Sequence, residues 1–226
     1  TMNQLYEDRE RLAVNVVGAF AAQEGVGMRG ATVTSQVVKP DLAIVFEGSP
    51  SDDFYFSTAE TQGRMRGGVQ IRLMDKSYIS NPLFIQYAEE VAKKYGIRYQ
   101  ETVRRGGSTN AGKISLTGKA VPVLVLGVPS RYVHTHYNFC AGADLEAAAD
   151  LAAEVIREAA FEPVGEQAFL RAKKVLESCE AVFCPLNVFG TMNKKNRELL
   201  RIGTELGKLR QIHLDKSDSG DILNDK

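Results

Sequence analysis

The sequence predicts an α/β fold, a three-layer α/β/α sandwich built on a mixed, largely parallel sheet. Short apolar runs of strand length alternate with segments whose apolar residues recur at helical spacing. The run "VPVLVLGVP" at 121–129 is apolar throughout, as strands are when helices cover both faces of a sheet. The sequence changes character after about residue 160. We therefore expect one domain over residues 1–160 and a small α/β appendage with a frayed end over residues 161–226.

The composition is that of an ordinary globular protein and excludes some classes of partner. The chain has 226 residues, of which 44% are hydrophobic and 25% are charged, and its 28 basic residues balance its 28 acidic ones. No surplus of positive charge would recruit nucleic acid, and no apolar run approaches the roughly 20 residues needed to span a membrane. The three cysteines lack zinc-finger spacing and suit a reducing compartment, so we expect a cytoplasmic location. The chain begins inside a predicted helix, so we expect it to be a piece of a longer one.

In the first part of the chain, three strands are predicted. Residues 12–22 form an apolar run that reads as a buried strand, residues 42–47 a second one, and residues 68–74 a short alternating one. Residues 30–38 between the first two are helical or irregular.

After residue 80, proline, glycine and turn residues mark where the predicted elements begin and end. Residues 81–95 have helical periodicity, with Pro82 near the start and Gly96 after the end. An alternating strand at 99–105 precedes the turn at Gly106 and Gly107, and "STNAGKISLTG" at 108–118 is typical of a capped short helix. A buried strand at 121–127 and a long helix at 142–160 complete the domain.

Polar side chains follow three of the predicted strands. Glu24 and Glu47 come at the ends of the first two, and His134 comes shortly after the strand at 121–127. Ligands of α/β sheets gather at the carboxyl ends of strands. Taken singly, each acid is explained by capping a turn, and a histidine pair such as His134 and His136 is usually structural. Together they supply the oxygen and nitrogen ligands that Zn²⁺, Co²⁺ or Mn²⁺ accept.

Several motifs in order resemble the second half of the catalytic domain of M42-type metallo-aminopeptidases, which are related to glutamyl and deblocking aminopeptidases. They are "QEGVGMRGA" at 23–31, "KPDLAIVFEGSPSDD" at 39–53, "RRGGSTNAGKI" at 104–114 and "VPVLVLGVPSRYVHTHY" at 121–137. The resemblance implies hydrolysis of N-terminal residues from peptide substrates by water activated at a divalent metal (Zn, Co or Mn). A second copy of the chain is a candidate partner.

The resemblance also implies roles for single residues. Glu24 matches the general base, while Glu47 and His134 match metal ligands. Gly25 stands where the family has a second glutamate that binds metal, and the family's His-x-Asp motif, bridging Asp and dimerising insert are missing. Because two of five expected ligands remain, we expect weak or absent metal binding and impaired catalysis. The alternative function is a non-catalytic binding or structural module with a decayed metal site.

Two further segments carry predictions. "GGSTNAGK" resembles the family's glycine-rich segment lining the substrate cleft, which implies substrate contacts from Thr109 and Asn110; a capped turn is the alternative. After residue 160, "CEAVFCPLNVFGTMNKKNRELL" resembles the C-terminal extension of some ATP-binding cassette proteins of metal-chelate or cobalamin uptake. A function residing in that tail is a third hypothesis.

Overall fold

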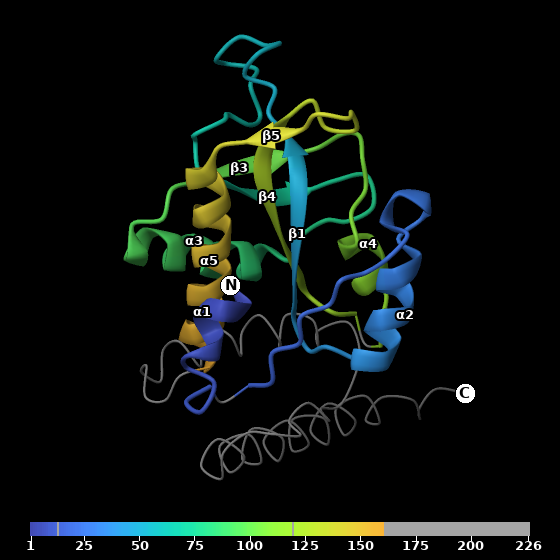
Figure 1. The fold of residues 1–226 in the computed structure, drawn as a ribbon. Helices are drawn as coiled ribbons and strands as arrows, with labels where there is room; N and C mark the ends of the chain where they lie inside the picture. The colour runs from blue at the N-terminus through green and yellow to red at the C-terminus, as the bar shows by residue number, and fades with distance from the viewer. Residues whose placement is uncertain (13, 119, 161–226) are drawn as a thin grey trace, which may run out of the picture.

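A mixed β-sheet forms the centre of the molecule (Figure 1). The computed structural model describes residues 1–160 except Ala13 and Lys119. In these residues the strand order is β1-β4-β2-β3, and β5 pairs with β4. The pairs β1–β4 and β2–β3 are parallel, whereas β4 is antiparallel to both β2 and β5. The strands are β1 (Ala43–Pro50), β2 (Val69–Met74), β3 (Tyr99–Val103), β4 (Val123–Arg131) and β5 (Phe139–Cys140). The predicted α/β class with a mixed sheet is confirmed.

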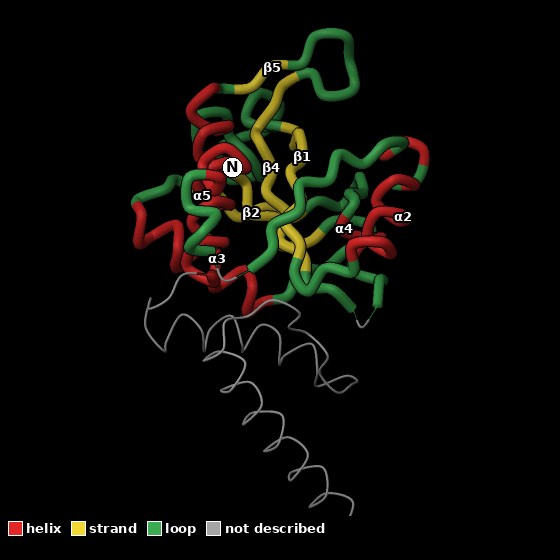
Figure 2. Tube along the Cα trace, turned by 60° about the horizontal axis from the view of Figure 1, so that its bottom comes forward, coloured by secondary structure: helices red, strands yellow, loops and turns green. Residues whose placement is uncertain are grey.

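One face of the sheet packs against α3 (Pro82–Tyr95) and α5 (Gly142–Ala160), with α1 (Met2–Tyr6) lying against α5 (Figure 2). Local signals fix α3: Asn81 accepts hydrogen bonds from the amides of Leu83 and Phe84, and Gly96 ends the helix at a φ of 66°. Ile71, Leu124, Leu126, Phe84 and Leu151 are fully or almost fully buried on this side. This is the larger of two apolar cores.

The other face carries a smaller core beneath α2 (Arg29–Val38) and α4 (Ala111–Ile114). Val45, Val123 and Val125 are buried here against Ala111. The Ser35 hydroxyl of α2 lies 2.8 Å from that of Thr117, which ties α2 to the segment after α4.

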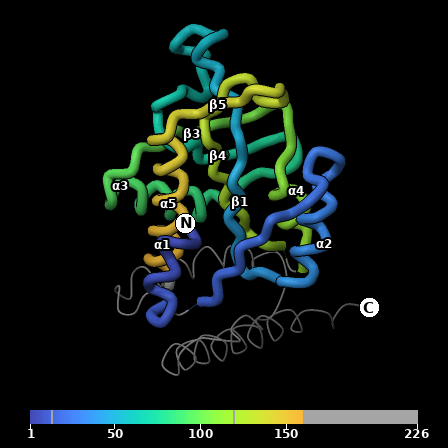
Figure 3. The backbone as a smooth tube through the Cα atoms, viewed as in Figure 1, coloured from blue at the N-terminus to red at the C-terminus, as the bar shows by residue number. Residues whose placement is uncertain are grey.

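The predicted strand at residues 12–22 is wrong. The segment runs from α1 past β1 to α2 without regular secondary structure before the turn at Glu24 (Figure 3). Two of its apolar side chains face solvent, with Val17 59% and Phe20 100% exposed, whereas Leu12, Val14 and Val16 are partly buried. A strand is stabilised by the ladder it forms with a neighbour, and among the described residues β4 is the one strand paired with β1. The other edge of β1 is unpaired in the described part of the chain, and the apolar run passes it without forming a ladder.

The other predicted elements lie close to their expected positions. The residues at 30–38 form the helix α2, and "STNAGKISLTG" contains the short α4. The predicted strand at 121–127 begins at Val123 and continues to Arg131, which brings its end nearer to His134. Of the helices within residues 1–160, none has the length and hydropathy needed to cross a bilayer. Every structural expectation for residues 161–226 lies outside the described residues.

Candidate active site

Glu47 lies near the end of β1, on the sheet face that carries α2 and α4. It is paired in register with Gly127 of the parallel strand β4. A Cβ atom at residue 127 would stand 2.7 Å from the Cβ of Ser49 and 3.2 Å from that of Gln70, so only glycine leaves these two side chains in place. The absence of a side chain at Gly127 thus lets Ser49 and Gln70 pack closely over β4 next to Glu47.

The carboxyl group of Glu47 is half-buried among charged neighbours. Burial raises its pKa above the ordinary value, and the nearby charge of Glu24 raises it further; Arg72 and His134 act in the opposite direction. These effects place Glu24 and His134 in the electrostatic surroundings of Glu47. Glu24 and His134 thus lie close enough to influence the charge of Glu47, but among the described residues the three side chains are not arranged as a group that could hold a metal ion.

Glu24 opens a short 3₁₀ turn (Glu24–Val26) that is held by unusual backbone geometry. Gln23 before it and Met28 after it both have a φ of 56°, in the left-handed region that few side chains adopt. The turn is closed by a 2.9 Å hydrogen bond from the Gly30 amide to the Ala22 carbonyl, and a Cβ at residue 30 would stand 2.4 Å from that oxygen. The glycine therefore lets α2 begin directly against the segment that carries Glu24.

Gly25 follows Glu24 in this turn and faces open space. A Cβ added at residue 25 would meet no atom within 4 Å, and its φ lies outside the left-handed region. The backbone can therefore accept a larger side chain at the position where the resemblance implies a glutamate ligand.

His134 lies in the loop between β4 and β5 and is exposed. Tyr132 and His134 both have left-handed backbone conformations, with φ of 59° and 68°. The Tyr132 carbonyl accepts a 3.1 Å bond from the Thr135 amide and a 2.7 Å bond from its hydroxyl, which closes the turn. Two such conformations in three residues cost energy that the surrounding structure must offset, a situation often found at functional sites.

A buried ion pair beside Glu47 was not identified from the sequence. Arg72 and Asp75 are each 5% exposed and lie 3.4 Å apart, and Arg72 also donates to the Ser49 hydroxyl at 2.9 Å. The signal for it was present: β2 alternates, so Gln70 and Arg72 share the face opposite the buried Ile71. Arg72 is the cation that partly offsets the negative charge around Glu47.

The two predicted substrate contacts, Thr109 and Asn110, lie in the glycine-rich segment before α4 and differ in their hydrogen bonding. Thr109 is fully buried; its hydroxyl donates to Asp75 at 3.1 Å and accepts from the Ala111 amide at 3.3 Å. Its side chain is therefore committed to holding the loop. Asn110 is partly buried, and its Oδ1 atom has no hydrogen-bond partner among the described residues. An unpaired buried acceptor is costly, so Asn110 is the member of the pair suited to an incoming N–H group.

The residues present do not by themselves fit a metal centre. Within residues 1–160, apart from the two positions left undescribed, no group of three or more His, Cys, Asp and Glu side chains is arranged to hold an ion. Catalytic zinc sites use three protein ligands, and a two-metal site needs more. Glu47 and His134 have the right ligand chemistry, but they are too few.

Comparisons with known proteins extend over most of the described domain. A sequence model of the M42 glutamyl aminopeptidase family matches residues 1–151, and one described as the MJ0874 family matches residues 141–222. Glutamyl aminopeptidase of Lactococcus lactis subsp. cremoris is 32% identical to this chain over 129 residues, which are 57% of this chain and 35% of the relative. Lysyl aminopeptidase of Pyrococcus furiosus is 30% identical over 143 residues, which are 61% of this chain and 39% of the relative. This chain thus spans less than two fifths of the length of these curated relatives.

Solved structures agree with the sequence comparison. The crystal structure of TET aminopeptidase from the marine sediment archaeon Thaumarchaeota archaeon SCGC AB-539-E09 superposes with a TM-score of 0.67 at 28% identity, over 78% of this chain and 46% of that one. The Pyrococcus horikoshii TET1 peptidase can assemble into a tetrahedron or a large octahedral shell. Its structure superposes with a TM-score of 0.53 at 27% identity, over 63% of this chain and 40% of that one. Since the first family model covers more than half of the 226 residues and the fold agrees with it, this chain belongs to the M42 glutamyl aminopeptidase family.

Proposed function

We propose that this chain is part of a divalent-metal-dependent aminopeptidase and that its catalysis is impaired in the form given by this sequence. The observation that carries the proposal is the half-buried carboxyl of Glu47, whose raised pKa reflects burial and the nearby Glu24 carboxylate, with His134 acting on the same group. A bound cation would offset this concentration of negative charge. Family membership supports the same reaction class, because its curated relatives are aminopeptidases that act at peptide N-termini.

In this proposal, each residue has one role. Glu24 is the general base: it takes a proton from the attacking water and delivers it to the leaving amine as the peptide C–N bond breaks. Glu47 and His134 are metal ligands. The unpaired Oδ1 of Asn110 accepts a hydrogen bond from the substrate, and Thr109 holds the loop that presents it.

The identity of the metal, the assembly and the location belong to the same proposal. We expect Zn²⁺, Co²⁺ or Mn²⁺, because imidazole and carboxylate ligands suit these ions. A homo-oligomer is supported by the assembly of the related TET1 peptidase. A cytoplasmic location is supported by the exposed thiol of Cys140, which is typical of a reducing compartment.

The metal site is tested by calorimetric titration with Zn²⁺. We expect weak binding by the wild-type chain and no measurable binding by His134→Gln. The matched control is His136→Gln, which removes another exposed imidazole two residues away. Equal losses in the two variants would contradict a specific role for His134.

The base is tested by release of a chromogenic amine from aminoacyl substrates in the presence of each metal. Any turnover should disappear in Glu24→Gln and persist in Glu10→Gln, which changes a carboxylate whose side chain is 84% exposed. Turnover that survives in Glu24→Gln would remove Glu24 from the proposed mechanism.

The second candidate is a non-catalytic binding or structural module derived from such a peptidase. It is favoured by the lack of a three-ligand cluster in the described part of the chain and by Gly25 at a ligand position. Stoichiometric metal in the purified protein, together with turnover that depends on Glu24, would eliminate this candidate.

A further inference from the structure

Asp75 follows β2 directly, and its side chain is almost fully buried, with 5% of the residue exposed. One carboxylate oxygen accepts hydrogen bonds from the Ser77 amide at 2.7 Å, the Ser77 hydroxyl at 2.8 Å and the Tyr78 amide at 3.0 Å. Aspartate side chains often bond to the backbone two residues further on, and in this way they close a turn. This oxygen of Asp75 therefore caps the turn by which the chain leaves β2.

The other carboxylate oxygen of Asp75 accepts from two groups that belong to the candidate active site. The Thr109 hydroxyl donates to it at 3.1 Å, and Nη1 of Arg72 lies 3.4 Å from it. The second terminal nitrogen of the same guanidinium donates to the Ser49 hydroxyl of β1 at 2.9 Å. Ser49 is two residues after Glu47 and points to the same face of the strand. Asp75 thus links the glycine-rich segment, through Arg72, to the strand that carries Glu47.

The turn capped by Asp75 is also the surface on which the glycine-rich segment rests. The Thr109 amide donates to the Ser77 hydroxyl at 3.4 Å. A Cβ atom at residue 112 would stand 2.5 Å from the oxygen of that hydroxyl, so Gly112 lets α4 pack directly against the turn. Asn110 lies between these two contacts, and its Oδ1 atom has no hydrogen-bond partner among the described residues. The place of this oxygen is therefore set by the backbone, which the turn supports.

We propose that Asp75 is a positioning residue of the active site, whose one carboxylate fixes both the Asn110 oxygen that faces the substrate and the Arg72 guanidinium that bonds to β1. The proposal rests on the function proposed above and adds to it a residue that touches neither substrate nor metal. An ionised carboxylate suits this role because both of its oxygens accept hydrogen bonds, and the groups around it are all donors.

Variants at the two ends of the link test the proposal by NMR on the ¹⁵N-labelled, metal-free protein. In Asp75→Asn the amide oxygen can still cap the turn, but the NH₂ group meets Arg72 and the Thr109 hydroxyl as a further donor. Thr109→Val keeps the shape of the side chain and removes the hydroxyl, whereas Thr109→Ser retains the hydroxyl.

We expect Asp75→Asn and Thr109→Val to shift the Asn110 side-chain NH₂ signals. Both should also speed hydrogen exchange of the Ala111 amide, which donates to the Thr109 hydroxyl, about tenfold, the effect of one lost hydrogen bond. Thr109→Ser should keep both readouts near their wild-type values. The Arg72 Nε–H signal should change in Asp75→Asn alone. Because both changes break one link, the double variant should shift the Asn110 signals no further than Asp75→Asn does.

Two controls separate positioning from a loss of stability or of charge. Asp144→Asn changes another buried carboxylate that holds a loop, since Asp144 accepts from the amides of Arg66 at 2.6 Å and Gly68 at 2.9 Å. It should lower the melting temperature and leave the Asn110 and Arg72 side-chain signals in place.

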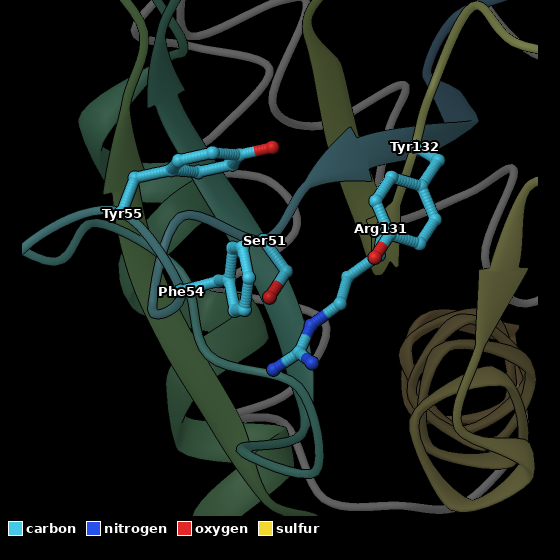
Figure 4. Close-up of a pocket in the computed structure, with 5 residues that line it drawn as sticks. All are labelled: Ser51, Phe54, Tyr55, Arg131 and Tyr132. Atoms are coloured by element: carbon cyan, nitrogen blue, oxygen red, sulfur yellow. The ribbon is translucent and has the colours of Figure 1, made fainter.

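Asp53→Asn breaks a different arginine–carboxylate pair. Arg131 extends toward Phe54, with its guanidinium carbon 5.5 Å from the ring centroid, and one of its nitrogens lies 3.3 Å from Asp53 (Figure 4). This variant should also leave the Asn110 signals unchanged, because neither Asp53 nor Arg131 is bonded to the glycine-rich segment.

Three results would overturn the proposal: unchanged Asn110 signals in Asp75→Asn, equal changes in Asp144→Asn, or effects of Asp75→Asn and Thr109→Val that simply add in the double variant. If Asp75→Asn does not fold, the contrast between Thr109→Val and Thr109→Ser decides, and equal Asn110 signals in these two variants reject the link. The measurements need neither metal nor substrate, so they are independent of the zinc titration. A coupled response combined with a failed titration would reject the proposed catalytic function and leave the role of Asp75 in holding the loop intact.

Discussion

Glu47 is a residue whose ionisation opposes folding. Burial is the largest cause of its raised pKa, and the charge of Glu24 adds to it. A carboxyl whose pKa is higher in the native state than in the unfolded state binds its proton more tightly when the protein is folded. The protonated group therefore stabilises the fold below about pH 4.5, and this stabilisation is lost as the pH rises through the native pKa.

We therefore predict that Glu47→Gln raises the free energy of unfolding at pH 7 and leaves it nearly unchanged at pH 4. Urea denaturation at the two pH values measures this. Glu60→Gln, at an exposed carboxyl, is the control and should show no such pH-dependent gain. A loss of stability in Glu47→Gln at pH 7 would mean that the carboxylate makes favourable contacts that outweigh its burial.

Gly25 is the residue at which this chain departs from the ligand pattern implied by its family resemblance. Because a Cβ there meets nothing within 4 Å, Gly25→Glu should fold normally and place a third carboxylate near Glu24. Loss of support for a ligand from neighbouring groups alone costs about 10–100-fold in metal affinity, so we predict at least tenfold tighter Zn²⁺ binding. Catalysis should not be restored to full activity, because two metal ions still lack ligands.

The matched control for this change is Gly48→Glu. Gly48 also faces open space, and it lies one residue from Glu47 on the opposite face of β1. Zinc calorimetry on both variants decides the question: equal affinities would mean that added charge, and not a new ligand, explains any gain.

At the scale of elements, the loop after β1 braces the loop that carries His134. Asp53 pairs with Arg131 at 3.3 Å, and the Ser51 amide donates to the Ser130 carbonyl at 2.8 Å. We predict that Asp53→Asn loosens the strained turn at Tyr132 and His134, shifts the His134 imidazole NMR signals and weakens metal binding several-fold. The ion pair itself contributes little to global stability, because it is partly exposed.

Asp8→Asn provides the control. Asp8 pairs with Arg157 at 2.9 Å, and its side chain is 20% exposed against 21% for Asp53. This variant should have a similar small effect on the melting temperature and none on the His134 signals. Identical imidazole spectra for the two variants would reject the bracing role.

Helices α3 and α5 are joined by a polar contact at their ends. The Tyr95 hydroxyl donates to the buried Glu158 at 2.6 Å, and this bond, with some burial, raises the pKa of Tyr95 to about 12. Because the native pKa exceeds the ordinary value of 10.0, the bond stabilises the fold below pH 10 and is lost between about pH 10 and 12.

We predict that the melting temperature of the wild type falls more steeply over this interval than that of Tyr95→Phe. Thermal unfolding at pH 8, 10 and 11.5 measures the difference, and Tyr6→Phe, at a largely exposed ring, is the control. Parallel curves for wild type and Tyr95→Phe would show that Tyr95 ionises without affecting the helix pair.

The elements differ in how far sequence alone predicts them. The helix expected at 81–95 is observed at Pro82–Tyr95, because its cap, its proline and its terminal glycine are all local signals. The run at 12–22 has equally clear apolar character, but a strand depends on a partner elsewhere in the chain. The same reason explains the missed Arg72–Asp75 pair: its burial depends on which side chains β1 and β2 place together.

At the scale of the whole molecule, an incomplete site should leave folding nearly independent of metal. A ligand present at its dissociation constant stabilises the native state by about 0.4 kcal/mol, and one at 100 times that concentration by about 2.7 kcal/mol. With Glu47 and His134 as its two expected protein ligands, the wild-type chain should therefore gain less than about 1 kcal/mol from 1 mM Co²⁺, whereas Gly25→Glu should gain about 1–3 kcal/mol. Urea denaturation with and without Co²⁺ measures both values. Mg²⁺, which favours sites made of oxygen atoms alone, is the control and should stabilise neither protein. A gain of several kcal/mol in the wild type would show that this chain assembles a complete metal site from residues in addition to Glu47 and His134.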